Sequence, residues 1–489
     1  MAEAAVDERQ LLKALRWYDG FVVALANPGF LIAALGYAIG SLGGWGAMLL
    51  WGFSAVMATL QNWIYAECAG MFPDKSGGIS LYAHEGWRRY FSLVGPIATF
   101  GYWFAWSSVL AIFGVTVGFL IQAEWFPGQD WAADLGIITI DFPKTVGALL
   151  VLLVWGFNIF GVRPAVWFGY VTGALLLIPL AVFMILPYFT GDWQSANMDW
   201  GGLDFSGGGI RLALVWLYLM GWSAYGVETC AVFAPEYHDT VRDTTRALKS
   251  SAVFSLAVYA LLPIGVTGVV GTDAAVADPV AFYVPAFEQI LGGAGGGIMV
   301  FLLIASLVLS MNTATMDGSR ALYGIAKDDM TVKQLAHLNR FLVPGRAMTV
   351  DVVVNLVLMF SLSSTLSILA AGNLGYILAH VFALTGFILL RKDRPAWPRP
   401  IKLAAVWVPI AGILAALNGL FIAIGSWSFE LTGYGGVRQL LIGIGVLLFS
   451  VLLFLYRRVV QDKQPITFRE EPEVMPAMSA GAPVVSGGP

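Results

Sequence analysis

One acidic residue lies well inside an apolar run, in surroundings that could do chemistry. Glu228 follows the irregular stretch Gly221-Trp222-Ser223-Ala224-Tyr225-Gly226, and both fall within an apolar span at 210–236. An ionised carboxylate in hydrocarbon is costly, and such groups by default mark a substrate or ion pathway. The structural alternative is a Glu side chain hydrogen-bonded to a neighbouring helix. The sequence favours the functional interpretation.

A second irregular stretch, Ala26-Asn27-Pro28-Gly29, interrupts the first apolar span at 20–41. Proline removes a backbone donor and glycine loosens the helix, so a break is expected there and at 221–226. Either break alone is explained by an ordinary kink, because Pro and Gly are frequent in membrane helices. Two breaks five spans apart say more, since a repeat of five helices must reverse its orientation in the membrane. Proteins built this way place a substrate at the midplane, where half-helix N-termini face an anionic group such as an amino-acid carboxylate.

The elements that must position these stretches are membrane helices. Hydrophobic residues make up 58% of the chain and charged residues 12%, against about 25% charged in soluble domains. A span needs about 20 residues to cross about 30 Å of hydrocarbon. Twelve such spans are predicted, at 20–41, 46–70, 93–122, 145–160, 164–189, 210–236, 248–271, 294–315, 347–366, 369–390, 403–427 and 437–456. Lipid is therefore the main solvent of this chain.

The basic residues give an independent check on the number of spans. Of the 27 Lys and Arg residues, only Lys144, Arg211 and Arg438 fall on the side opposite the N-terminus. Under the positive-inside rule both termini are expected in the cytoplasm. Residues 1–19 show no cleavable signal pattern, and the polar tail from 458 is expected to be disordered. Glu67, Asp317 and Arg320 lie near the cytoplasmic ends of spans, where gate or loop ion pairs are expected.

Missing motifs exclude several functional classes. The chain has no G-x-x-x-x-G-K-[ST] phosphate loop, no H-E-x-x-H pair and no G-x-S-x-G elbow. One of its four His residues falls in a predicted span, which argues against haem or zinc. A channel is not indicated, because the sequence shows neither a repeated selectivity-filter element nor a ring of like charges. A secondary transporter fits best, and no enzymatic activity, cofactor, metal or nucleic-acid partner is expected.

Four stretches resemble the amino acid-polyamine-organocation transporter family. The matching motifs, in chain order, are Ala66-Glu67 to Pro73 with Ser76-Gly77-Gly78 to Tyr82, Trp222-Ser223 to Glu228-Thr229, Ser319-Arg320 to Asp328, and the basic loop Leu390 to Pro395 with Pro398-Arg399-Pro400. Each motif is moderately specific, but four in the right order span most of the chain.

The resemblance implies an all-α membrane protein with a leucine-transporter-like core of five plus five inverted helices and two added helices. The expected parts are a cytoplasmic segment 1–19, a first repeat 20–190, a second repeat 191–390, helices eleven and twelve in 391–457, and a tail 458–489. The protein is expected to be an integral protein of the bacterial inner membrane. Its oligomeric state is not predicted.

The resemblance also implies a substrate site and a coupling residue. Trp222 is expected to wall or gate the site, and Glu228 to respond to protons. The full set of expected substrate contacts is Asn27, Gly29, Trp106, Ser107, Trp222, Ser223 and Tyr225. Two features depart from the family: span one lacks its G-S-G motif, and the fifth span lacks the Lys of some members. A lysine relay is therefore absent, and sodium held by first-span carbonyls with Ser306, Ser310 and Thr313 stays an alternative.

The function that follows is a permease moving an amino acid or related amine by alternating access, coupled to protons or exchanging substrates. Two alternatives stay open. One is sodium-coupled uptake of another small amine, and the other is a non-transporting scaffold or receptor built on a transporter frame.

Overall fold

The computed structural model describes residues 10–136, 138–204, 206–293, 295–361, 365–431 and 436–472, without the side chains of 365–367 and 429. Its long elements are the helices α1 Trp17–Ala24, α2 Ala26–Met71, α3 Gly78–Trp87, α4 Val94–Ser107, α5 Val109–Trp125, α6 Phe142–Ile159, α7 Val162–Ile185, α9 Gly207–Ala224, α10 Thr240–Ala277, α11 Tyr283–Leu291, α12 Gly296–Lys327, α13 Gly345–Ser361, α14 Thr365–Asp393, α15 Trp407–Gly425 and α16 Val437–Tyr456.

The short elements join or extend these helices. They are α8 Pro187–Thr190, the 3₁₀ helices η1 Ser195–Asn197, η2 Gly226–Glu236, η3 Lys333–Ala336 and η4 Phe429–Leu431, and the π-helix η5 Arg457–Gln461. Strands β1 Ala132–Asp134 and β2 Thr139–Asp141 form one antiparallel hairpin, with Ala133 opposite Ile140.

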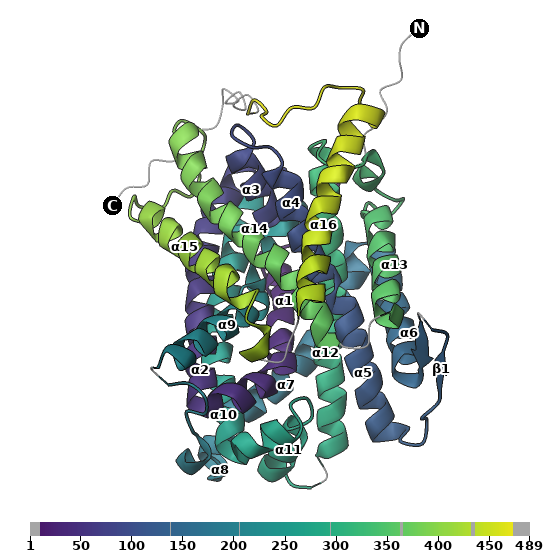
Figure 1. Cartoon of the computed structure of the whole chain (residues 1–489), viewed down its shortest axis with the longest axis vertical. Helices are drawn as coiled ribbons and strands as arrows, with labels where there is room; N and C mark the ends of the chain where they lie inside the picture. Colours follow the sequence, from purple (N-terminus) through teal and green to yellow (C-terminus); the bar gives the residue numbers. More distant parts are fainter. Residues whose placement is uncertain are drawn as a thin grey trace.

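Long apolar helices run along the molecule and enclose its core (Figure 1). Within the described residues, ten helical segments are long and apolar enough to cross a membrane. The segment Trp17–Met71 covers two predicted spans, since α2 turns at Gly43, whose φ of 71° suits glycine. The helix α13 overlaps the predicted span 347–366 but has 17 residues, and residues 362–364 lie outside the described part. The chain is therefore an integral membrane protein.

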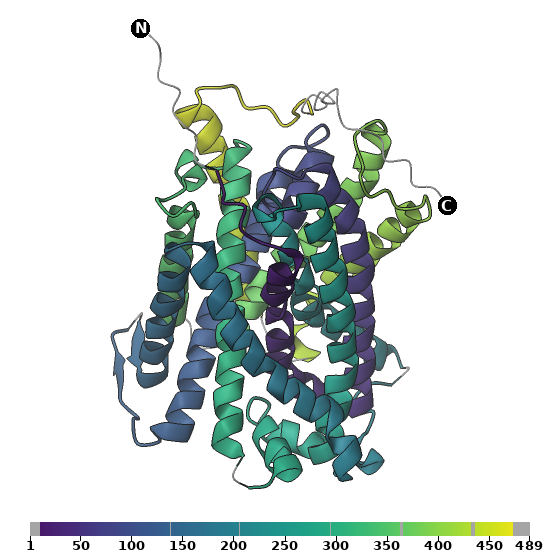
Figure 2. The ribbon, with the colours of Figure 1, turned by 180° about the vertical axis from the view of Figure 1, so that it is seen from behind.

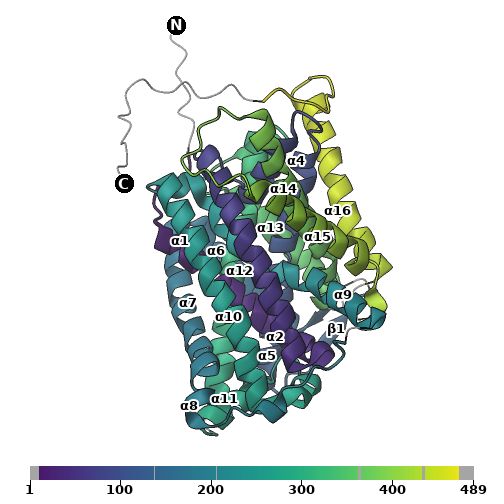
Figure 3. The same cartoon turned by 90° about the vertical axis from the view of Figure 1, so that its left-hand side faces the viewer.

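The two ends of the helical body differ. Helix α3 lies at one end, called here the α3 end, and the β-hairpin, α8 and α11 lie towards the other, called the hairpin end (Figure 1). Seen from the side, α2 and α10 pack along each other through much of the body (Figure 3). Viewed from behind, the short α1 lies between α7 and α10 (Figure 2), and it also packs against η2. The first break is thus held inside the bundle.

The first break falls at Leu25, between α1 and α2. Pro28 has no N–H to donate to the preceding turn, and three carbonyls around the break accept from side chains of other helices. Ser310 Oγ donates to the Ala26 carbonyl at 3.0 Å, and Thr313 Oγ1 donates to the Val23 carbonyl at 3.0 Å. Tyr259 OH donates to the Asn27 carbonyl at 3.0 Å. Helices α12 and α10 therefore stabilise the break.

The second break changes the type of helix. Helix α9 ends at Ala224, and after Tyr225 the chain continues as the 3₁₀ helix η2 for 11 residues. A 3₁₀ run longer than three or four residues is uncommon, and within a longer helix it often marks a functional hinge. The interruptions thus lie beside the predicted stretches: the first is at Leu25, with residues 26–29 already helical in α2, and the second follows Ala224 and leads into η2, which carries Glu228.

The start of the tail is packed against the body rather than free. Phe468 O accepts from Ser92 N at 2.8 Å, and Glu470 N donates to Arg88 O at 2.9 Å. The rings of Phe91 and Phe468 lie 6.3 Å apart. The polar composition of 458–489 predicts disorder. Composition cannot indicate the ring contact of Phe468 or the two backbone hydrogen bonds of Phe468 and Glu470. Residues 473–489 lie outside the described part.

Candidate substrate site between two helix breaks

The two breaks lie against each other in the centre of the bundle. Asn27 Nδ2 donates to the Ala224 carbonyl at 3.3 Å and to Ser255 Oγ at 3.1 Å. A Cβ added to Gly226 would lie 2.4 Å from Asn27 Oδ1, which only glycine avoids without a shift. The side chain of the first break therefore bonds to the end of α9, and the backbone of the second break approaches it closely.

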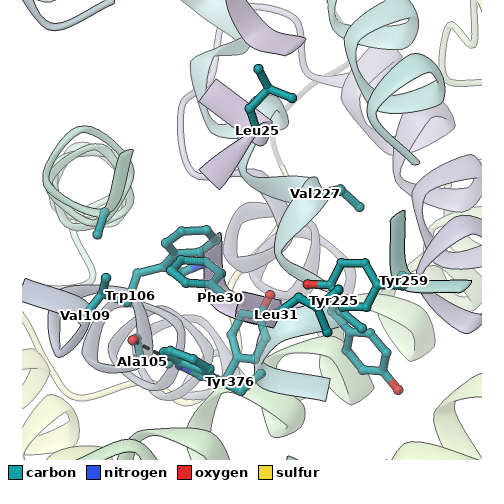
Figure 4. Close-up of a cluster of buried hydrophobic side chains, with 14 of the residues drawn as sticks. Leu25, Phe30, Leu31, Ala105, Trp106, Val109, Tyr225, Val227, Tyr259 and Tyr376 are labelled. Atoms are coloured by element: carbon teal, nitrogen blue, oxygen red, sulfur yellow. Dashed lines mark hydrogen bonds between the residues drawn. The ribbon is translucent and has the colours of Figure 1, made fainter. Parts of the chain in front are cut away.

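Aromatic rings cover this junction on its hairpin side. The Phe30 ring centroid lies 5.0 Å from that of Trp222 and 5.3 Å from that of Trp106. Phe113 lies 6.2 Å from Trp222. In Figure 4, Phe30 and Trp106 lie on one side of the buried cluster and Tyr225 and Tyr259 on the other. Trp222 Nε1 donates to the Ala105 carbonyl at 3.4 Å, which fixes the ring across the site.

Cavities approach the site from both ends of the molecule. A cavity of about 380 Å³ at the hairpin end is lined by Tyr37, Phe113, Trp222 and Asp278 among others. Another of about 540 Å³ at the α3 end is lined by Ser76, Pro235, Tyr323 and Asp328 among others. Trp222 is 4% exposed and Glu228 is fully buried. The junction is thus closed on both sides, with Trp222 lining the first cavity.

Two carboxylates lie next to the junction, and sequence reasoning singled out only one of them for the site. Tyr376 OH donates to Glu228 Oε1 at 2.7 Å. The neighbouring Thr229 donates to Asp317 Oδ1 at 2.8 Å, and Tyr102 OH donates to the same oxygen at 2.9 Å. The sequence predicts a gate or loop ion pair for Asp317, but within the described ranges no Lys or Arg side chain forms a salt bridge with it. Asp317 lies three residues before Arg320, and this spacing suggests an ion pair between them. In the structure Arg320 pairs with Glu236.

Several buried polar atoms around the junction have no hydrogen-bond partner among the described residues. They are Asn27 Oδ1 and Asp317 Oδ2, together with Glu228 Oε2 and Trp106 Nε1, two side chains that interact with each other without a hydrogen bond of normal geometry. Unpaired buried polar atoms are costly and rare. Three of these four are acceptors, which a ligand carrying N–H donors would satisfy. This arrangement suits an ammonium group better than a carboxylate.

The remaining predicted contacts are bonded to other helices. Ser107 Oγ accepts from Asn355 Nδ2 of α13 at 2.8 Å, and Ser223 Oγ pairs with Tyr259 OH at 2.7 Å. Tyr225 OH donates to Asn418 Oδ1 of α15 at 2.9 Å. A Cβ on Gly29 would lie 2.4 Å from Ser310 Oγ, so Gly29 allows close packing on α12. The structure thus gathers Asn27, Trp106, Trp222 and Glu228, whereas the hydroxyls of Ser107, Ser223 and Tyr225 are hydrogen-bonded to other helices and Gly29 packs on α12.

The hydroxyls named for sodium are committed to hydrogen bonds. Ser310 and Thr313 donate to the first-break carbonyls of Ala26 and Val23, and Ser306 Oγ donates to Leu302 O of its own helix at 2.8 Å. Sodium would need those same carbonyl and hydroxyl oxygens as acceptors. In this conformation the oxygens stabilise each other.

An ion-pair network closes the α3 end. Glu85 contacts Lys75 at 2.8 Å, Arg394 at 2.7 Å and Arg88 at 3.2 Å. Burial opposes ionisation of Glu85, but Lys75 and its other charged neighbours outweigh it and hold its pKa at about 2. Burial raises the pKa of Asp328 to about 6, although Lys75 lies 3.1 Å away.

The same network includes the one His-containing group of possible metal ligands in the described chain. Ligand atoms of His84, Glu85 and Asp328 lie within 4.8 Å of one another. Burial lowers the pKa of His84 to about 3, so the ring is neutral at pH 7. Because cations already surround Glu85, the group fits an ion-pair gate better than a metal centre.

Comparison with known proteins identifies the family. Residues 21–452 match the family model described as amino acid permease. The chain belongs to the amino acid permease family. It is 24% identical to the gamma-aminobutyric acid permease of Bacillus subtilis over 466 residues, which cover 88% of this chain and 91% of the relative. It is 23% identical to the D-serine/D-alanine/glycine transporter of Escherichia coli over 343 residues, covering 65% and 70%.

A third relative covers still more of the chain. An uncharacterized transporter of Mycobacterium tuberculosis is 25% identical over 480 residues, which are 94% of this chain and 96% of that protein. The amino acid permease family agrees with the resemblance read from the four motifs. The relatives named here are themselves permeases and transporters.

Proposed function

We propose that this permease is a secondary active transporter that moves an amino acid or related amine by alternating access, with proton uptake and release at Glu228. The observation that carries the proposal is the meeting of two broken spans beside a fully buried acid. Asn27 bonds to the end of α9, and acceptors of Asn27 and Asp317 around that contact lack hydrogen-bond partners among the described residues. Such a junction offers backbone and side-chain groups to a zwitterion at mid-membrane depth.

The proposed architecture is five plus five inverted helices followed by two more, in a bacterial inner membrane with both termini cytoplasmic. The charge distribution supports this orientation, because only Lys144, Arg211 and Arg438 fall on the hairpin side of the predicted topology. The α3 end and its ion pairs would then face the cytoplasm. The cavity that reaches Trp222 would face the outside.

Proton coupling is proposed because a fully buried acid, Glu228, lies at the junction. Ser310 and Thr313 donate to the Ala26 and Val23 carbonyls but keep lone pairs for a cation, so the dependence of flux on pH and on sodium decides between the two ions. Gain and loss of one proton at the Glu228 carboxylate would change the charge of the site with each transport cycle.

Counterflow uptake tests the proposal. The purified protein is placed in liposomes loaded with an unlabelled amino acid, and entry of the labelled compound is measured, starting with γ-aminobutyric acid, glycine, D-alanine and D-serine. Trp222→Ala is expected to lower the initial rate at least tenfold, because the aromatic cover of the site is lost. Trp167→Ala is the matched control, since this ring of α7 is 64% exposed.

The outcomes separate the alternatives. Flux that needs sodium and ignores a pH gradient would replace the proton with sodium. No flux for any amino acid, amine or polyamine would favour the scaffold. Equal losses in Trp222→Ala and Trp167→Ala would remove the assigned site.

A further inference from the structure

We propose that Asp317 is a second acid of the coupling site, which sets the pH at which Glu228 takes up and releases its proton. The inference rests on the proposed transport function and assigns a role to a residue of a different helix. Asp317 belongs to the continuous helix α12, whereas Glu228 belongs to the 3₁₀ segment η2.

The two carboxylates are linked by short contacts on both sides. On the backbone side, Thr229 follows Glu228 directly and donates to Asp317 at 2.8 Å. On the other side, Tyr376 bonds to Glu228, Tyr102 bonds to Asp317, and the two tyrosine rings lie 5.9 Å apart. Glu228 also interacts with Trp106, and Asp317 Oδ2 has no hydrogen-bond partner among the described residues. Both acids therefore belong to one buried polar cluster.

Few charged side chains face this polar cluster. The titratable groups around the two acids are Arg320 of α12, Cys230 of η2, Tyr65 of α2, Tyr102 of α4, Tyr259 of α10, Asp351 of α13, and Tyr376 of α14, which in turn contacts His380. The only cation among them, Arg320, donates to both carboxylate oxygens of Glu236. Two neighbouring carboxylates in a dry site cannot both ionise cheaply, so their titrations are coupled.

The position of the pair suits a transport cycle. Thr229 Oγ1 bridges the hinge-like η2 to the rigid α12, so any movement of η2 would change this bond and the distance between the two acids. A proton from water of one cavity would bind the pair in one conformation. The proton would leave to water of the other cavity after η2 has moved and the distance between the two acids has changed. Only an O–H bond forms and breaks in this step.

The test is the pH profile of counterflow in liposomes with equal pH on both sides. Asp317→Asn removes a like charge beside Glu228, so the midpoint of the profile is expected to move to lower pH by about one unit. Asp243→Asn is the matched control. It changes another buried acid, in α10, which accepts from Asp239 N and is not among the groups around the pair. Its midpoint is expected to equal that of the wild type.

A second variant keeps the test usable if Asp317→Asn does not fold. Tyr102→Phe removes the donor 2.9 Å from Asp317 but keeps the acid. Its midpoint is expected to move in the opposite direction, because the ionised pair loses a hydrogen bond. Tyr283→Phe, which removes a bond to the Ile32 carbonyl, serves as its control.

The results distinguish this inference from the proposed function. Wild-type flux with midpoints unchanged in Asp317→Asn and Tyr102→Phe overturns the role of Asp317 and leaves transport intact. An equal shift in Asp243→Asn also overturns it. A wild type without flux contradicts the proposed function itself, and a wild type whose flux ignores pH contradicts both the role of Glu228 and that of Asp317.

Discussion

Replacing Gly226 by Ala tests how closely the two breaks approach. A Cβ at this position would lie 2.4 Å from Asn27 Oδ1 and 3.4 Å from the Trp106 ring. Overpacking in a well-packed interior costs about 1–3 kcal/mol. Replacing glycine also reduces the conformational entropy of the unfolded chain, which stabilises the folded protein by about 0.4–1 kcal/mol. A net loss of about 1–2 kcal/mol in folding free energy is therefore expected.

Unfolding in detergent, followed by circular dichroism, measures this loss. Gly419→Ala is the control, because a Cβ there meets nothing within 4 Å and Ala is the better helix former. Gly419→Ala is expected to be neutral or stabilising. The cost of Gly226→Ala is also expected to fall when Asn27 is changed to Ala, since the clashing oxygen is gone and the two changes are coupled. Equal costs of Gly226→Ala with and without Asn27 would refute the contact between the breaks.

Three further predictions concern other parts of the molecule. Glu85→Gln should cost about 3–5 kcal/mol at pH 7, because it leaves buried cations unpaired, while Glu430→Gln, in an exposed pair with Arg211, should cost less than about 1 kcal/mol. The pKa of Glu85 in the folded protein is about 2, below its ordinary value. The stability that its ionised carboxylate contributes is therefore complete above about pH 4.5 and is lost as pH falls towards 2. A Glu85→Gln variant whose stability falls with acid as steeply as that of the wild type would contradict this. Glu228→Gln should flatten the pH dependence of counterflow without loss of folding, and a profile like that of the wild type would remove its coupling role. Phe468→Ala should raise the rate of limited proteolysis in the 462–472 segment about 2–10-fold through loss of its ring contact with Phe91. Ile466→Ala, a similarly exposed side chain outside that contact, should not change the rate.

Most of the helical frame follows from local signals in the sequence. A run of apolar residues long enough to cross a bilayer predicts a helix without knowledge of its neighbours, and both interrupted spans contain Pro or Gly at the break. Glu228 stood out because it is an acid inside such a run. Trp222 and Asn27 followed from their places next to the breaks.

The partners across the bundle could not be predicted in this way. Asp317 lies close to Arg320 in sequence. Only the fold shows that Arg320 donates to Glu236, whereas Tyr102 and Thr229 donate to Asp317. The tail was likewise judged on composition, although a single ring of Phe468 and two backbone bonds attach it to the α3 end. Such contacts join residues more than 80 positions apart, so no local pattern records them.

A structure of the wild-type protein with a transported amino acid bound tests the central claim most directly. The account predicts the ligand between Asn27, Trp106 and Gly226, with its ammonium within hydrogen-bond distance of the unpaired acceptors and Trp222 covering it. A ligand bound outside this junction, or a liganded protein in which both spans run as unbroken α-helices, would contradict the account.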